Sequence, residues 1–234
     1  MKGNDNMKKI AILALMLCLS ANTAFAASFT DIDNHWAKDS IVTLADKGIV
    51  NGVTDTLFMP DATVTRAQYL KMIMETTGVS TKPMREGECL DANGNDWYAD
   101  YLQGALDCGL VPKDMVINYT EKVQYTVDEE GKATSTKVIY TGQFNGNNPI
   151  TREEMAVLTQ YMYQYTRTII TNKKTPDTEI EFADAQSISK WAEASVAQAV
   201  KNGFMDGMDN NMFNPADTAT RAQASTVILR VLNK

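Results

Sequence analysis

Three arginines occupy the same position of a tetrapeptide that recurs along the chain. The copies are Thr65-Arg66-Ala67-Gln68, Thr151-Arg152-Glu153-Glu154 and Thr220-Arg221-Ala222-Gln223. Each fits a capping box, in which the threonine side chain accepts from the third helical amide and the Gln or Glu side chain accepts from the cap amide. The arginine then lies in the first helical turn, where the helix dipole disfavours a cation by about 0.3–1 kcal/mol. We therefore expect an anionic group opposite each arginine.

Two kinds of anion could meet these arginines. The first is an acidic side chain of the protein, such as Asp31, Asp91 or Asp184, in a salt bridge between neighbouring units. The second is a carboxylate of a ligand, held by the guanidinium together with the amides of the helix start. The residue types leave both alternatives open.

All the tryptophans share a second repeated position. Trp36, Trp97 and Trp191 each come 12 residues before a glycine, near an expected helix start. Core packing is the usual fate of such a residue and is the favoured interpretation. The alternative is an exposed indole face on which a sugar ring could stack, which beside an arginine would suit an acidic carbohydrate.

The arginines and tryptophans belong to a unit that occurs three times. From Trp to Arg the first and third units span 30 residues, whereas the second spans 55, which places a 25-residue insertion between Gly109 and Phe144. Each unit reads as helix, loop, helix, with apolar or small residues at helical spacing. A helix pair of this size cannot bury its apolar face alone. We therefore predict a mainly α fold in which the three units pack as a pseudo-threefold helical bundle.

The insertion has the pattern of a β-hairpin. Residues 123–127 alternate apolar and polar, 128–132 offer a turn, and 136–141 supply a second β-branched run. The expected organisation is a signal peptide at 1–26, a first unit at 27–80, a second at 86–166 with the hairpin at about 113–142, a linker at 167–179 and a third unit at 180–234.

The first segment has the pattern of an export signal. Lys8 and Lys9 precede an apolar run at 10–19, and Ala24-Phe25-Ala26 fits a cleavage site. The run is shorter than the ~20 residues that span a bilayer, so we expect no membrane insertion after cleavage. Export permits a disulfide between Cys89 and Cys108, and two buried thiols are an equally weighted alternative.

The composition limits the chemistry. The 234 residues carry a formal net charge of −7 and include one histidine. An acidic chain is not expected to bind nucleic acid through its net charge, and one histidine argues against a histidine metal cage or a Ser-His-Asp triad. Residues 91–96 resemble the start of a calcium loop. Counted from Asp91, the sixth position is Asp96 and the twelfth is Leu102, where an EF-hand needs glycine and glutamate. We expect no metal and no cofactor.

An enzyme is not expected either. The chain has no G-x-S-x-G and no H-E-x-x-H sequence. The three units leave only the insertion and short linkers to house a catalytic domain. A wall-polysaccharide hydrolase remains an alternative, because paired carboxylates cannot be located in an acidic sequence without a fold.

Together these motifs resemble the S-layer homology repeat, which usually occurs in threes. The resemblance rests on F-x-D, His35-Trp36-Ala37, G-I-V-x-G at 48–52, F-x-P at 58–60 and T-R-A-Q at 65–68, and it covers nearly the whole chain after residue 26. It implies a cell-wall-associated protein whose inter-repeat grooves bind secondary cell-wall polysaccharide, often with pyruvylated amino sugars.

The resemblance also implies a set of ligand-binding residues. By position these are Arg66, Arg152 and Arg221 on the acidic group, Trp36, Trp97, Trp191, Asp31, Asp91 and Asp184 nearby, and Gly52, Gly207, Gln68 and Gln223. The second unit departs from this pattern, with Leu110-Val111-Pro112-Lys113 in place of the glycine and Glu153 in place of alanine. A further alternative is a surface adaptor or S-layer structural protein that displays its hairpin to a protein partner.

Overall fold

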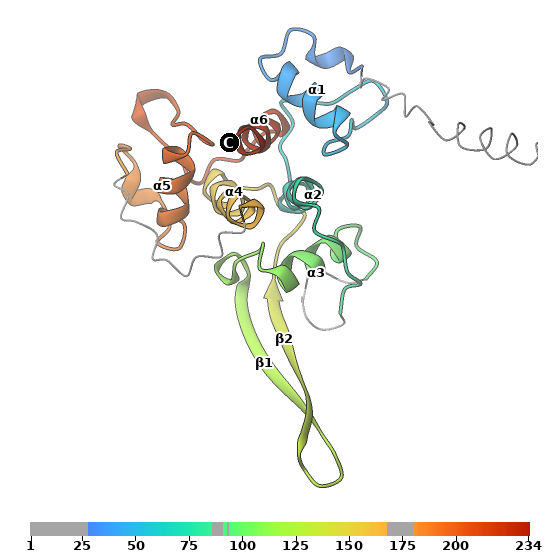
Figure 1. Cartoon of the computed structure of the whole chain (residues 1–234). Coiled ribbons are helices and arrows are strands. Elements are labelled where there is room, and N and C mark those ends of the chain that lie inside the picture. The colour runs from blue at the N-terminus through green and yellow to red at the C-terminus, as the bar shows by residue number, and fades with distance from the viewer. Residues whose placement is uncertain (1–27, 86–90, 93, 168–179) are drawn as a thin grey trace, which may run out of the picture.

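The computed structural model describes residues 28–85, 91–92, 94–167 and 180–234 (Figure 1). The expected signal peptide, Cys89 and nearly all of the expected linker lie outside the described residues. The predicted boundaries of the three units therefore stay predictions.

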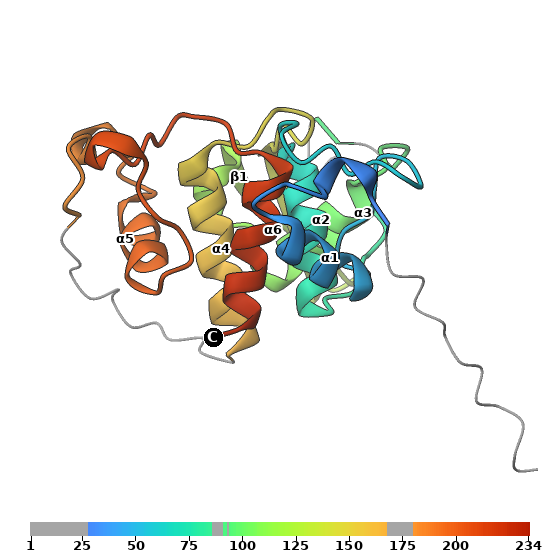
Figure 2. The ribbon, with the colours of Figure 1, turned by 90° about the horizontal axis from the view of Figure 1, so that it is seen from above.

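Three long helices form the centre of the molecule. They are α2 (Arg66–Thr77), α4 (Arg152–Thr166) and α6 (Arg221–Leu232), and they pack on one another. Figure 1 looks along them, and Figure 2 shows α4 and α6 side by side. Each begins at a predicted capping box, with both reciprocal hydrogen bonds present at Thr65, Thr151 and Thr220. The tetrapeptides thus start the helices where the sequence predicted.

Three shorter helices surround this centre. They are α1 (Lys38–Asp46), α3 (Ala99–Cys108) and α5 (Glu193–Lys201). Each packs against the long helix of a neighbouring unit, so that α1 lies beside α6, α3 beside α2 and α5 beside α4 (Figure 1). Four 3-10 turns complete the helical elements described, at Thr30–Ile32, Lys113–Met115, Ala185–Ser187 and Asp209–Asn211.

The units close into a ring through their backbones. The amide of Val64 donates to the carbonyl of Ala219, that of Ala219 to Ile150, and that of Ile150 to Val64, each at 3.0 Å. All three residues are fully buried. Each unit therefore donates one of these bonds to a neighbour and accepts one from the other, and the predicted pseudo-threefold bundle is confirmed.

The insertion forms the predicted hairpin. Strands β1 (Ile117–Val127) and β2 (Ala133–Gln143) pair antiparallel and project away from the helices (Figure 1). In the turn, Oδ1 of Asp128 accepts from the amides of Glu130 and Lys132, at 3.1 and 2.8 Å. The second strand ends at Gln143, and the chain returns to the helical unit at Phe144. The hairpin therefore does not interrupt the ring.

Among the described residues, no helix is both long enough and apolar enough to cross a membrane. Within the same residues, no three His, Cys, Asp or Glu side chains gather as a metal site would require. Cys108 is half-buried, and burial raises the pKa of its thiol. Because Cys89 is not described, its pairing with Cys108 stays a prediction.

Candidate functional site

Each repeated arginine reaches from the start of its long helix into the next unit. Nε of Arg152 donates to the carbonyl of Phe213 at 2.8 Å, and Nη2 donates to that of Asp206 at 2.9 Å. Arg221 makes the equivalent bonds to Phe58 at 2.9 Å and to Asn51 at 2.8 Å. Each guanidinium also lies over the ring of the phenylalanine whose carbonyl it binds.

Arg66 repeats this geometry with a difference in its third partner. Nε donates to Phe144 at 2.7 Å, and Nη2 donates to the carbonyl of Met115 at 2.8 Å. Nη1 donates to Oε1 of Glu154, which makes an ion pair. Arg66 and Arg152 are buried, whereas Arg221 is partly exposed. The first partners of all three arginines are therefore carbonyl oxygens.

The aspartates bind the same loops from within their own unit. Asp31 accepts from the amides of Phe58 and Met59, at 2.9 and 2.6 Å, and Asp184 accepts from those of Phe213 and Asn214, at 2.8 and 2.7 Å. Asp91 accepts from the amides that follow the hairpin, at Phe144 and Asn145. Burial opposes ionisation of Asp31, but these amide bonds leave its pKa below the ordinary value.

The salt-bridge alternative holds at one arginine, because Arg66 of the first unit forms an ion pair with Glu154 of the second. Among the described residues, Asp31 and Asp184 form no ion pair with the repeated arginines; they bind the amides of the phenylalanine loops whose carbonyls accept from those arginines. The attraction acts at longer range: burial lowers the pKa of Arg221, and the charge of Asp31 opposes that shift.

The helix-start amides are also not available to a ligand. The amides of Arg152 and Glu153 donate to the carbonyls of Asp217 and Pro215, at 2.9 and 3.0 Å. The corresponding amides of α2 and α6 donate to loop carbonyls of their neighbouring units in the same way. These bonds use the groups that a helix start leaves unpaired, so the expectation of an anion held by the amides is wrong.

Two cavities combine residues of all three units. One, of about 210 Å³, is lined by Arg152 of the second unit, Gly207 and Gln223 of the third and Trp36 of the first. The other, of about 200 Å³, is lined by Arg221 of the third unit, Gly52 and Gln68 of the first and Trp97 of the second. We call them the Trp36 groove and the Trp97 groove. Their linings correspond position by position under the pseudo-threefold arrangement.

The tryptophans in these grooves are exposed. Trp36 is 66% exposed and Trp97 is 53% exposed, so the core-packing interpretation is wrong for both. The helix start buries the neighbouring Ala37 and Tyr98 instead, which turns each indole outward. Trp191 is half-buried and packs against the core. The indoles of the two grooves are therefore available to a ligand.

The glycines serve packing as well as the grooves. A Cβ at Gly52 would lie 2.5 Å from the ring of Phe29 and 2.2 Å from the carbonyl oxygen of Thr54. A Cβ at Gly207 would lie 2.5 Å from the ring of Phe182. The close approach of these rings therefore requires glycine at both positions, whether or not a ligand is bound.

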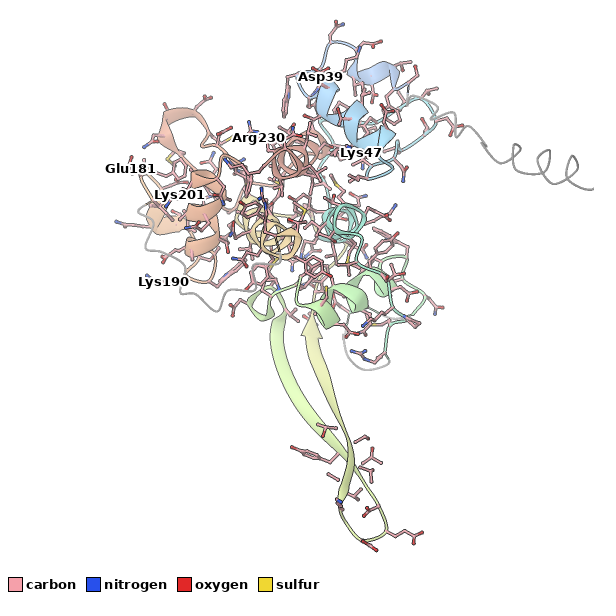
Figure 3. The ribbon with its side chains drawn as sticks, in the orientation of Figure 1. Asp39, Lys47, Glu181, Lys190, Lys201 and Arg230 are labelled. Carbon is pink, nitrogen blue, oxygen red and sulfur yellow. The ribbon has the colours of Figure 1, made fainter. Side chains whose placement is uncertain are left out.

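Sequence reasoning missed groove residues one turn along the long helices. Lys71 follows Gln68 by three residues and lines the Trp97 groove, while Thr226 follows Gln223 by three and lines the Trp36 groove. Helical spacing from the capping residue was the signal that could have found them. Arg230 also lines the Trp36 groove, on the side of α6 that faces α5 (Figure 3), where it donates to Asp206 at 2.7 Å.

The fold and the grooves define a class: a ring of three helical units with grooves that residues of all three units line. Residues 28–70 and 181–225 match the family described as "S-layer homology domain". The chain belongs to the S-layer homology family. The matched segments lie in the first and third units, and the contacts above relate the second unit to them.

The relatives are longer proteins of several kinds. The chain is 34% identical to an amylopullulanase of Thermoanaerobacterium thermosulfurigenes, over 88% of this chain and 10% of the relative. It is 22% identical to the "Surface-layer 125 kDa protein" of Lysinibacillus sphaericus, over 99% of this chain and 17% of the relative. It is 30% identical to a cellulosome-anchoring protein of Acetivibrio thermocellus, over 38% of this chain and 20% of the relative.

The chain therefore spans a fifth or less of each of these relatives. The family match and the S-layer and anchoring relatives indicate attachment to the cell surface. The chain is a cell-surface protein associated with the cell wall.

Proposed function

We propose that the chain attaches to the bacterial wall by binding an anionic secondary cell-wall polysaccharide in the Trp36 and Trp97 grooves. The observation that carries the proposal is the repeated pairing of a guanidinium and an exposed indole in one cavity. The indole offers a flat apolar face to a sugar ring, and the guanidinium offers hydrogen bonds to an acidic substituent.

Each groove retains free donors. Nη1 of Arg152 and Nη1 of Arg221 have no hydrogen-bond partner among the described residues. Gln68 and Gln223 use their Oε1 atoms in the capping boxes, which leaves the Nε2 donors of both side chains for a ligand. A pyruvyl ketal on an amino sugar carries a carboxylate beside the ring and would use the guanidinium and the indole together.

The size of the grooves supports a short contact with an extended polymer. Both are smaller than the roughly 300 Å³ at which enclosed small-molecule pockets begin. Binding one substituted sugar in each of two grooves would combine two modest affinities on one chain of sugars. The proposed role is non-catalytic anchoring.

Substitutions of the exposed indoles test the proposal. Trp36→Ala and Trp97→Ala should each weaken binding of purified wall polysaccharide, about tenfold for a contact of 1.4 kcal/mol. Tyr125→Ala, which removes a 65% exposed aromatic side chain far along the hairpin, is the matched control and should bind like the wild type. Unchanged affinity in both tryptophan variants would contradict the proposal.

The hairpin supports a second role, the display of a binding surface to a protein partner. Its far end exposes Tyr125 and Val127, whose exposed fractions are 65% and 56%, beyond the helices (Figure 1). Thr120 pairs with Thr141 in the ladder, so replacing 121–140 by a short glycine turn would remove the outer hairpin. This variant should keep wall binding and lose any protein partner captured by the intact chain; retention of the partner would contradict the second role.

A further inference from the structure

The hairpin is a sheet without a third strand. In the part of the chain that the structure describes, β1 and β2 pair only with each other, and they project away from the helices (Figure 1). A two-stranded ribbon is marginally stable in water, and an independently stable sheet needs three or more strands or a helix to pack on. The outer edge of each strand therefore offers unpaired backbone groups to a further strand.

The register gives the ribbon one mostly apolar face. Residues that oppose each other in an antiparallel pair share a face, and the faces alternate along each strand. One face has the pairs Glu121–Tyr140, Val123–Val138 and Tyr125–Thr136, whereas the other has Lys122–Ile139, Gln124–Lys137 and Thr126–Ser135. Aliphatic and aromatic residues thus gather at four of the six positions of the first face, and at one position of the second.

The edge of β2 is the less protected of the two. The register is regular between residues 120–126 of β1 and residues 135–141 of β2, and it shifts on either side. Natural sheets protect their edges with charged residues, prolines and bulges. The regular stretch of β1 carries the charges of Glu121 and Lys122, whereas that of β2 carries Lys137 alone, and neither stretch has a proline. A strand of another chain would therefore pair more readily with β2.

The regular stretch of β2 is also complementary to itself. Val138 is the central residue of 135–141 and of the whole strand, Ala133–Gln143. A two-fold axis at Val138 would pair two copies of β2 antiparallel over their full length. The opposed pairs would be Val138–Val138, Lys137–Ile139, Thr136–Tyr140 and Ser135–Thr141. No charge would lie directly opposite a like charge, and pairs of β-branched and aromatic residues stabilise a sheet.

We infer that β2 pairs antiparallel with β2 of a second copy of the chain, which joins the two hairpins into one four-stranded sheet. This inference names the partner for the second role of the hairpin proposed above and rests on that role. Because Val123 pairs with Val138 in each copy, four valines would form one row across the sheet. The two-fold pairing closes at two chains, and it places the helices of the copies at opposite ends of the sheet.

Matched lysine substitutions test the inference by sedimentation equilibrium of the full chain over a range of concentrations. The wild type should show an equilibrium between monomer and dimer. Val138→Lys places two lysines directly opposite each other at the two-fold axis, and it should raise the dissociation constant of the dimer about tenfold or more. Val123→Lys is the control, because it alters the same pair of the hairpin but lies one strand away from the new contact. It should dimerise like the wild type.

Cysteine substitutions locate the contact independently. Directly opposed residues of antiparallel strands have Cα atoms about 4.5–5.5 Å apart, a distance that a disulfide can bridge. Under mild oxidation Val138→Cys should therefore form a covalent dimer, whereas Val123→Cys should stay at the background level that the wild type sets with its own cysteines. Equal cross-linking of the two variants would contradict pairing through the edge of β2.

The outcomes separate this inference from the second role of the hairpin. A wild type that stays monomeric at every concentration would overturn the inference, and so would lysine variants that dimerise alike. A monomeric chain that captures a different protein through residues 121–140 would overturn the pairing of two copies while the second role stands. A monomeric chain that captures no protein through these residues would overturn both.

Discussion

At the scale of single residues, the repeated arginines hold the ring together as well as facing the grooves. The helix dipole led us to expect an anion opposite each one; carbonyl oxygens of the next unit lie opposite all three, and Arg66 also pairs with the carboxylate of Glu154. The sequence could predict that the arginines need acceptors. It could not predict these acceptors, because they belong to backbone groups 61 to 163 residues away.

Alanine at these positions should destabilise the protein. Arg66→Ala leaves two carbonyls and the carboxylate of Glu154 without their donor, and each unsatisfied buried group costs about 1–3 kcal/mol. Arg66→Ala should therefore lower the free energy of unfolding by roughly 3 kcal/mol or more, and the partly exposed Arg221→Ala should lower it less. Urea denaturation measures both.

Lys190→Ala is the control for loss of a positive charge, because the Lys190 side chain is 94% exposed. It should leave the free energy of unfolding within about 0.5 kcal/mol of the wild type. An Arg66→Ala variant as stable as this control would show that the arginine does not hold the ring.

At the scale of elements, the helix starts and the hairpin were predictable, whereas the contacts of segment 82–85 with α3 were not. Capping boxes and alternating β-branched runs are local patterns, so residues 65–68 and 123–127 revealed their structures directly. Residues 82–85 instead bind α3 through a network that no local pattern encodes. The amide of Lys82 donates to Asp100, and Arg85 and Lys82 both donate to the carboxylate of Asp107.

This network predicts a pH dependence. Hydrogen bonds from Arg85, and less strongly from Lys82, lower the pKa of Asp107 from 3.8 to about 2 although burial opposes the shift. A pKa that is lower in the folded state means that Asp107 stabilises the fold above about pH 4 and that this stabilisation is lost as the pH falls through 2.

The Asp107→Asn variant measures the effect. At pH 6 it should be less stable than the wild type by roughly 1–2 kcal/mol, a range that allows for the partly exposed cations. The two free energies of unfolding should converge as the pH falls to 2, because the wild-type carboxylate is then becoming protonated. A difference that stays constant between these pH values would contradict the ion-pair account.

At the scale of the whole molecule, the three units are parts of one closed ring. A single helix pair cannot bury its apolar face, so their association could be predicted from the sequence. It did not predict that each short helix packs on the long helix of a neighbour, because the apolar stripe of a helix such as α1 does not specify its partner. The same interlocking explains why each groove needs residues from all three units.

The closed ring predicts cooperative unfolding. The hydrogen bonds among Val64, Ile150 and Ala219 cannot survive the loss of any one unit. Urea unfolding followed by tryptophan fluorescence and by far-ultraviolet circular dichroism should therefore give one coincident transition. Separate transitions would show that the units fold as independent domains.

The central claim is that the grooves bind an anionic polymer of the wall. Its most direct test is sedimentation of the purified chain with cell walls before and after the secondary polysaccharide is removed. We expect the chain to sediment with intact walls and to stay in solution with stripped walls. Equal sedimentation with both preparations would contradict the account.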